Sequence, residues 1–185
     1  MGKSINLIFG GISEVVGGNG IAVIMLTDRD KRYAVSVVCD DMMKRQISMR
    51  NMPDGSRDRL LPEVMSKMLH DISDGGMAYR IDIDDISDGE YKTAITDMKT
   101  LRRYDIRLSD AVLLSLVSDI PIYMDERLMK RQASPYRENA DRMAIPLITL
   151  DAGRLKEELD KAVAAENYRL AALIKEELDN RRKDC

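Results

Sequence analysis

The first part of the chain alternates short apolar runs with turn-forming residues. Segments rich in Ile and Val cover residues 5–13, 20–26 and 32–39, and Gly-rich or charged turns separate them. Runs of this length and composition are typical of β-strands. Two longer stretches follow, at residues 40–52 and 59–72, in which apolar positions recur with helical spacing. The pattern therefore predicts three strands followed by two helices.

The middle of the chain shows a period of two. Residues 77–98 alternate apolar and polar positions on both sides of Asp88 and Gly89, a pair that favours a tight hairpin turn. A further strand is predicted at residues 101–107, and it leads directly into an apolar helix. Strands that alternate with helices but also form hairpins indicate an α+β domain with a mixed, mainly antiparallel sheet.

The C-terminal third has a different composition. Residues 132–150 contain two prolines and no clear period, so we interpret them as a connector between a domain at 1–131 and a tail at 151–185. The tail is rich in Ala, Glu, Leu and Lys, which is typical of helices. Two apolar faces separated by a break at residues 166–167 predict a helical hairpin: Leu155, Leu159, Ala162 and Val163, then Tyr168, Ala171, Ile174 and Leu178.

Composition limits the function classes. The formal net charge is −3, so no overall positive field attracts nucleic acid, and any such contact must be local. The two cysteines, Cys39 and Cys185, make neither a disulfide framework nor a zinc site. No apolar run is long enough to cross a membrane, and the start of the chain does not match a signal peptide. We expect a cytoplasmic protein with no membrane partner.

Candidate chemistry gathers where the strand at residues 101–107 meets the apolar helix. Asp105, Arg107, Ser109 and Asp110 fall within six residues. On one interpretation, Ser109 or Asp110 simply caps the helix N-terminus. On the other, Asp105 and Arg107 share one side of the strand and converge with Ser109 and Asp110 on a divalent cation and a phosphate. Both interpretations stay open at this point.

The segment DIRLSDAVLLSLVSDIPIY, residues 105–123, resembles the signature of the bifunctional nuclease family. The likeness extends over about residues 4–130, including the turn SDGEYKTAI. It implies a compact α+β domain, hydrolysis of DNA or RNA phosphodiester bonds and self-association into a homo-oligomer. It also implies site roles: Mg²⁺ or Mn²⁺ held by Asp105 and Asp110, a phosphate contacted by Arg107, and a site oriented by Ser109.

The resemblance has departures. Leu108 stands where the family usually has Pro, and when Arg59 is aligned with the family's Arg, Glu63 and Val64 fall on its usual His and Asp positions. The single histidine, His70, lies away from that motif. The alternative to a nuclease is therefore a non-catalytic interaction or adaptor protein.

The segment AENYRLAALIKEEL, residues 165–178, is similar to the UVR motif of excision-repair subunits and stress adaptors. This resemblance implies a partner that is a second hairpin, a UVR-containing repair subunit or a protease-associated adaptor. The predicted contacts are Tyr168, Leu170 and Leu173, which cannot all face the partner helix within the hairpin. The combination of the two resemblances is typical of bacterial proteins.

Overall fold

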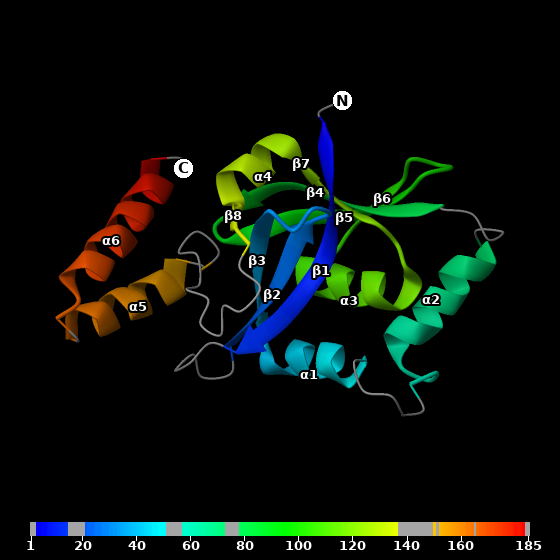
Figure 1. Ribbon diagram of the computed structural model, residues 1–185, viewed down its shortest axis with the longest axis horizontal. Coiled ribbons are helices and arrows are strands. Elements are labelled where there is room, and N and C mark those ends of the chain that lie inside the picture. The colour runs from blue at the N-terminus through cyan, green and yellow to red at the C-terminus, as the bar shows by residue number, and fades with distance from the viewer. Residues whose placement is uncertain are drawn as a thin grey trace.

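The computed structural model describes residues 3–14, 21–50, 57–72, 78–136, 150, 152–164 and 166–183. Its strands form one mixed sheet in the order β6-β5-β4-β7-β1-β2-β3-β8 (Figure 1). Within this sheet β4 and β7 pair in parallel, whereas the other neighbouring strands pair antiparallel. The predicted α+β class with a mixed, mainly antiparallel sheet is therefore confirmed.

The sheet has eight strands, and the described part of the chain has six helices. The strands are β1 Ser4–Glu14, β2 Ile21–Asp28, β3 Tyr33–Asp40, β4 Tyr79–Ser87, β5 Glu90–Asp97, β6 Arg103–Asp105, β7 Ile122–Asp125 and β8 Ser134–Pro135. The helices are α1 Asp41–Arg50, α2 Leu61–Ile72, α3 Leu108–Ser118, α4 Glu126–Gln132, α5 Ala152–Ala164 and α6 Tyr168–Lys183. None of the described helices has the length and apolar character needed to span a membrane.

The predicted hairpin turn is present between β4 and β5. Ser87 pairs with Glu90 across it, and Asp88 and Gly89 have φ angles of 49° and 77°. Two central residues with positive φ define the turn type whose twist suits antiparallel strands. The next strand is shorter than predicted, because β6 ends at Asp105. The prediction that Asp105 and Arg107 lie on one strand is therefore wrong.

The sheet is coiled around α3. This helix packs against both β5 and β3, which stand five strand positions apart in the sheet. At about 4.8 Å per step, a flat sheet would separate these strands by roughly 24 Å. Instead, the hydroxyl of Tyr91 on β5 donates to the backbone carbonyl of Ser36 on β3 at 3.4 Å. The two halves of the sheet thus face each other across the helix start.

A bulge in β1 accompanies this coiling. The register with β2 shifts between Phe9 and Gly11, and Gly11 has a φ angle of 141°, which side chains rarely adopt. At Gly10, an added Cβ would lie 2.8 Å from the side chain of Thr27. Bulges bend a strand and increase its twist, and glycine permits both the backbone angle and the close approach. The long, curved β1 is visible in Figure 1.

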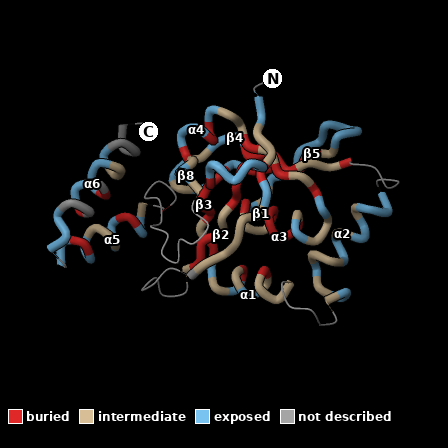
Figure 2. Tube along the Cα trace, viewed as in Figure 1, coloured by how far each residue is buried: buried red, intermediate tan, exposed pale blue. Residues whose placement is uncertain are grey.

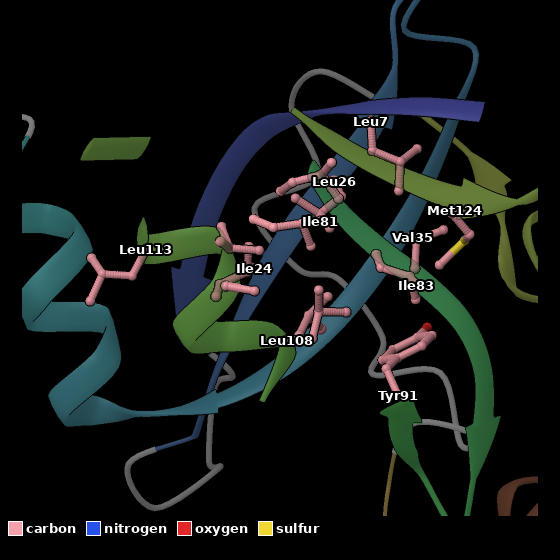
Figure 3. Packing of buried hydrophobic residues seen from close by; sticks show 14 of the residues in the cluster. Leu7, Ile24, Leu26, Val35, Ile81, Ile83, Tyr91, Leu108, Leu113 and Met124 are labelled. Atoms are coloured by element: carbon pink, nitrogen blue, oxygen red, sulfur yellow. The ribbon is translucent and has the colours of Figure 1, made fainter. Parts of the chain in front are cut away.

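The core is aliphatic and lies between α3 and the concave face of the sheet (Figures 2 and 3). The helix buries residues on most of its circumference, as expected from its nearly continuous apolar sequence. Its buried side chains are Leu108, Ala111, Val112, Leu113 and Leu114. They meet strand residues from both halves of the sheet, including Ile83, Tyr91, Ile24 and Val35. This single core holds the coiled sheet together.

Two elements were not predicted from the sequence. Helix α4 begins after Asp125, whose carboxylate accepts hydrogen bonds from the backbone N–H groups of Arg127 and Leu128, at 2.8 and 3.2 Å. Strand β8 pairs Ser134 and Pro135 with β3. It lies within the segment interpreted as a connector, whose residues 137–149 are outside the described part of the chain.

The C-terminal helices α5 and α6 pack on each other, as the apolar pattern predicts. Their shared cluster contains Leu155, Ala162, Ala171 and Ile174. Val38 of β3 packs against the same cluster, so the hairpin contacts the sheet. Val163 is exposed, which contradicts its predicted place on the buried face. Tyr168 is 68% exposed, whereas the side chains of Leu170 and Leu173 are outside those the structure describes.

Replacing the side chain that joins the two halves of the sheet tests the coiled arrangement. Tyr91→Ala removes a buried ring, and we expect it to lower the free energy of unfolding by about 3–5 kcal/mol. Tyr91→Phe keeps the ring and loses one long hydrogen bond, so it should cost about 1 kcal/mol or less. Urea unfolding followed by circular dichroism measures both values. Tyr104→Ala, on β6, is the control, because Tyr104 is 53% exposed. A cost for Tyr91→Ala no larger than that of the control would contradict the assigned packing.

Candidate functional site

The candidate site begins at the N-terminus of α3. Arg107 is the N-cap residue, with extended φ and ψ angles of −64° and 139°, and its side chain makes no capping hydrogen bond. Its carbonyl accepts the first helical bond, from the N–H of Ala111 at 3.0 Å. Ser109 and Asp110 lie inside the first turn. Both residues thus lie at the helix N-terminus, as one of the two interpretations has it, but Arg107 is the cap residue, because the helix begins at Leu108.

Arg107 and Asp110 form a two-point ion pair. The Nε of Arg107 donates to one carboxylate oxygen of Asp110 at 2.7 Å, and Nη2 donates to the other at 3.3 Å. The pKa of Arg107 is raised by the hydrogen bond that it donates to Asp110 and then by the charge of Asp110, with further contributions from Asp40 and Glu90. Because the Arg107 side chain is 66% exposed and that of Asp110 is 35% exposed, solvent screens the pair, which contributes about 1 kcal/mol or less to stability. Its clearest effect is to orient the guanidinium.

A cavity of about 490 Å³, here called the central cavity, opens where the coiled sheet closes on the start of α3. Its wall comes from the end of β3, the β4–β5 turn and the first residues of α3, with Arg154 from α5. The lining residues are Val37, Val38, Cys39, Asp40, Asp88, Gly89, Glu90, Tyr91, Arg107, Leu108, Ser109 and Arg154. Arg107 and Ser109 therefore share a cavity with the carboxylates of Asp40 and Glu90.

A second cavity of about 370 Å³, here called the edge cavity, lies along β5 and β6. Asp105 lines it, with Asp84, Lys92 and Arg103. Tyr104 pairs with the core residue Ile95, so Asp105, the next residue along the strand, lies on the opposite face of the sheet. Arg107 and Glu90 border both cavities. Three of the four predicted site residues, Asp105, Arg107 and Ser109, therefore line one or both of these cavities, whereas Asp110 lines neither.

The two aspartates do not form one cation site. Asp105 lines the edge cavity, whereas Asp110 lines neither cavity and has both oxygens bonded to Arg107. Among the described residues, no group of three or more His, Cys, Asp or Glu side chains is arranged to hold a metal ion. Divalent cations in proteins take several oxygen ligands, so this pair alone does not fit the predicted Mg²⁺ or Mn²⁺ site. The two aspartates therefore do not support a chemical step that uses a metal ion.

The sequence interpretation missed Asp40, Cys39 and Glu90. Asp40 caps α1, because its carboxylate accepts from the N–H of Met43 at 2.7 Å. An acidic residue before a helical run signals a cap, but nothing in the sequence brings it to the start of α3. Glu63, aligned with the family's histidine, forms an ion pair with Arg50 at 2.7 Å. Glu63 therefore joins α2 to α1 and is not among the residues that line either cavity.

A comparison with known families covers most of the domain that contains the two cavities. The domain is of the α+β class, with a mixed sheet coiled around one apolar helix and a charged cavity at the start of that helix. A model of the bifunctional nuclease domain matches residues 24–137, and the chain belongs to this family. The search of curated proteins gave no match. Apart from Arg154, every lining residue of the central cavity lies within the matched region.

The cavity wall includes a thiol that its surroundings keep protonated. Burial raises the pKa of Cys39 from 9.0 to about 12, and the negative charge of Asp40 adds to the effect. The thiolate is the reactive form, so this difference of about three pH units lowers its fraction near pH 8 by about 1,000-fold.

Alkylation with iodoacetamide measures this effect in a Cys185→Ser variant, in which Cys39 is the remaining thiol. At about pH 8 the folded protein should react about 1,000-fold more slowly than the urea-unfolded protein. Between about pH 8 and pH 10 the rate in the folded state should keep rising about tenfold per pH unit, whereas that of the unfolded state levels off above its ordinary pKa. Equal rates for the two states would show that Cys39 is not in the assigned environment.

Proposed function

We propose that the protein hydrolyses phosphodiester bonds of DNA or RNA, and that the central cavity is the reaction site. The observation that supports this proposal is the shared wall of the cavity. Arg107 and Ser109 lie on it opposite carboxylates from β3 and β5, within the region that matches the bifunctional nuclease domain.

The first turn of α3 is suited to a phosphate. The first N–H groups of a helix lack partners within the helix, and the helix dipole favours an anion there. Arg107 adds a guanidinium whose position is set by Asp110, so Asp110 is a positioning residue in this proposal. Ser109 supplies a hydroxyl beside the same phosphate. A substrate phosphate bound here would have its negative charge neutralised by Arg107.

Hydrolysis also needs a group that takes a proton from the attacking water. The carboxylates of Asp40 and Glu90 line the cavity that Arg107 and Ser109 enter, and we assign one of them to this role. The edge cavity continues from Arg107 and Glu90 toward Lys92, Arg103 and Asp105. A nucleic-acid strand that passes through both cavities would meet Lys92 and also Arg103, which is paired with Asp84. Asp105 belongs to the proposed site because it lines this path. Use of Mg²⁺ or Mn²⁺ stays a prediction.

Arg107→Ala tests the proposal. We expect cleavage of single- or double-stranded DNA or RNA to fall by about 100-fold or more, because the charge that stabilises the transition state is lost. The free energy of unfolding should change by about 1 kcal/mol or less, since the Arg107 side chain is largely exposed and solvent screens its ion pair. Rates are measured with Mg²⁺, with Mn²⁺ and with a chelator.

Arg45→Ala is the matched control. Arg45 forms a similar exposed ion pair on a helix, with Asp41 at 2.7 Å, and it is not a lining residue of either cavity. This variant should retain the wild-type rate. If the Arg107→Ala variant cleaves at the wild-type rate, the central cavity is not the reaction site.

A second candidate is a non-catalytic interaction protein. The exposed ring of Tyr168 favours it, because a large aromatic side chain in solvent is typical of a binding surface. On this proposal the hairpin of α5 and α6 binds a repair or stress-response partner through Tyr168, Leu170 and Leu173, in the manner of the UVR motif. Wild-type protein that cleaves no substrate with any ion would favour this candidate over the nuclease.

A further inference from the structure

Helix α2 presents its apolar side to solvent. Leu61, Val64, Met65, Met68 and Ile72 fall within a sector of about 100° on its surface, here called the α2 stripe. Leu61, Met68 and Ile72 are 71%, 58% and 65% exposed. No residue of α2 is buried, and Figure 2 shows no buried segment along it. An amphipathic helix normally faces the core with such a stripe, so α2 has the opposite orientation.

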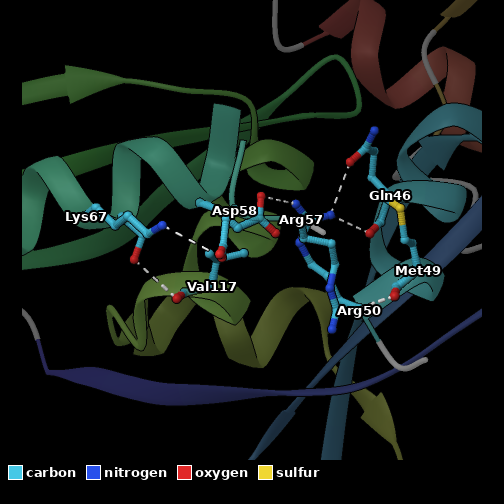
Figure 4. Close-up of polar contacts among 9 residues, drawn as sticks. Gln46, Met49, Arg50, Arg57, Asp58, Lys67 and Val117 are labelled. Carbon is cyan, nitrogen blue, oxygen red and sulfur yellow. Dashed lines mark hydrogen bonds and ion pairs between the residues drawn. The ribbon is translucent and has the colours of Figure 1, made fainter. Parts of the chain in front are cut away.

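Polar contacts join α2 to the rest of the domain, and Figure 4 draws some of them. Glu63 pairs with Arg50 of α1 at 2.7 Å, and both side chains are almost buried. The hydroxyl of Ser66 donates to the carbonyl of Val117 on α3 at 3.2 Å. Leu69 contributes a partly buried apolar contact with the core. Because polar bonds fix the inner face, the helix cannot turn its stripe inward without breaking them, and a contiguous exposed stripe marks an interaction surface.

We infer that the α2 stripe is the contact surface for a second copy of this chain, with the two helices antiparallel around a twofold axis near Met68. In such a pair the same patch meets itself, so each contact occurs twice. Val64 of one copy then lies against Ile72 of the other, and Met68 lies against Met68. The stripe is long enough for this, because twelve residues of helix extend about 18 Å.

Charge complementarity supports this occupant. Lys67 and Asp71 lie one turn apart on the same flank of the stripe and carry opposite charges. In an antiparallel pair, this flank faces its own copy, so Lys67 of each chain lies within reach of Asp71 of the other. Lys67 currently pairs with Asp58 at 3.7 Å, but both groups are well exposed and the pair contributes little. The surface is separate from β1 and β2, in which Ile8, at 38%, is the one exposed apolar residue of the described part.

Light scattering of the full chain tests the proposal. At about 100 µM the wild type should have a mass near 42 kDa, twice the 21.0 kDa of one chain. Met68→Glu buries two charges at the axis and should return the mass to that of one chain. Met42→Glu is the matched control, because Met42 is 67% exposed but lies on α1, and it should remain dimeric. A wild-type monomer, or a dimer that Met68→Glu leaves intact, would overturn the proposal.

Charge exchange tests the antiparallel arrangement. Lys67→Glu alone and Asp71→Lys alone each place like charges together at both contacts, so each should weaken self-association by about tenfold or more. An equimolar mixture of the two variants restores both opposite-charge contacts and should form a mixed dimer as strong as the wild type. A mixture no stronger than either variant alone would refute the antiparallel pairing. The outcome does not depend on nuclease activity.

Discussion

The coiling of the sheet around α3 is the constraint on which the remaining structure depends. A helix that is apolar on nearly all sides must be covered on nearly all sides, and one flat sheet covers only one. The sheet therefore curves until β3 and β5 face each other, and Tyr91 spans the remaining distance to Ser36. The bulge and glycines of β1 allow the curvature, so local backbone chemistry and the burial of one helix support the same geometry.

The location of the candidate site follows from this geometry. Because the body of α3 is buried, polar chemistry can reach it only at its ends, and the N-terminus is the end that attracts anions. There the coiled sheet brings residues 40, 90 and 107 to one cavity, although they are far apart in the sequence. The pKa of the Arg107 guanidinium is raised first by Asp110, and the charges of Asp40 and Glu90 add to the effect. The cavity exists only because the sheet closes.

The sequence predicts the strands and turns that depend on neighbouring residues. It misses the contacts that form only when the sheet closes around α3. The strands of 4–14, 21–28 and 33–40 are Ile- and Val-rich runs between turns, and the hairpin at Asp88 and Gly89 has a period-two pattern. These signals act locally. The sequence identifies the polar cluster at 105–110 but places Asp105 and Arg107 on one strand. This arrangement does not form, because β6 ends two residues before Arg107. Asp40 and Glu90 carry no local sign of their role. Helix α4 has seven residues, too few to show a period clearly.

The two ends of α3 serve different surfaces, and the length of the helix keeps them apart. Arg107 stands at its start, whereas Ser66 of α2 binds the carbonyl of Val117 near its end. Ten residues of helix separate these points by about 15 Å along the axis. A second copy that docks on the α2 stripe therefore lies near the C-terminal end of α3, which is the end away from the central cavity. Self-association through α2 leaves the cavity of each chain open to a nucleic-acid strand, so the two surfaces are compatible in one protein.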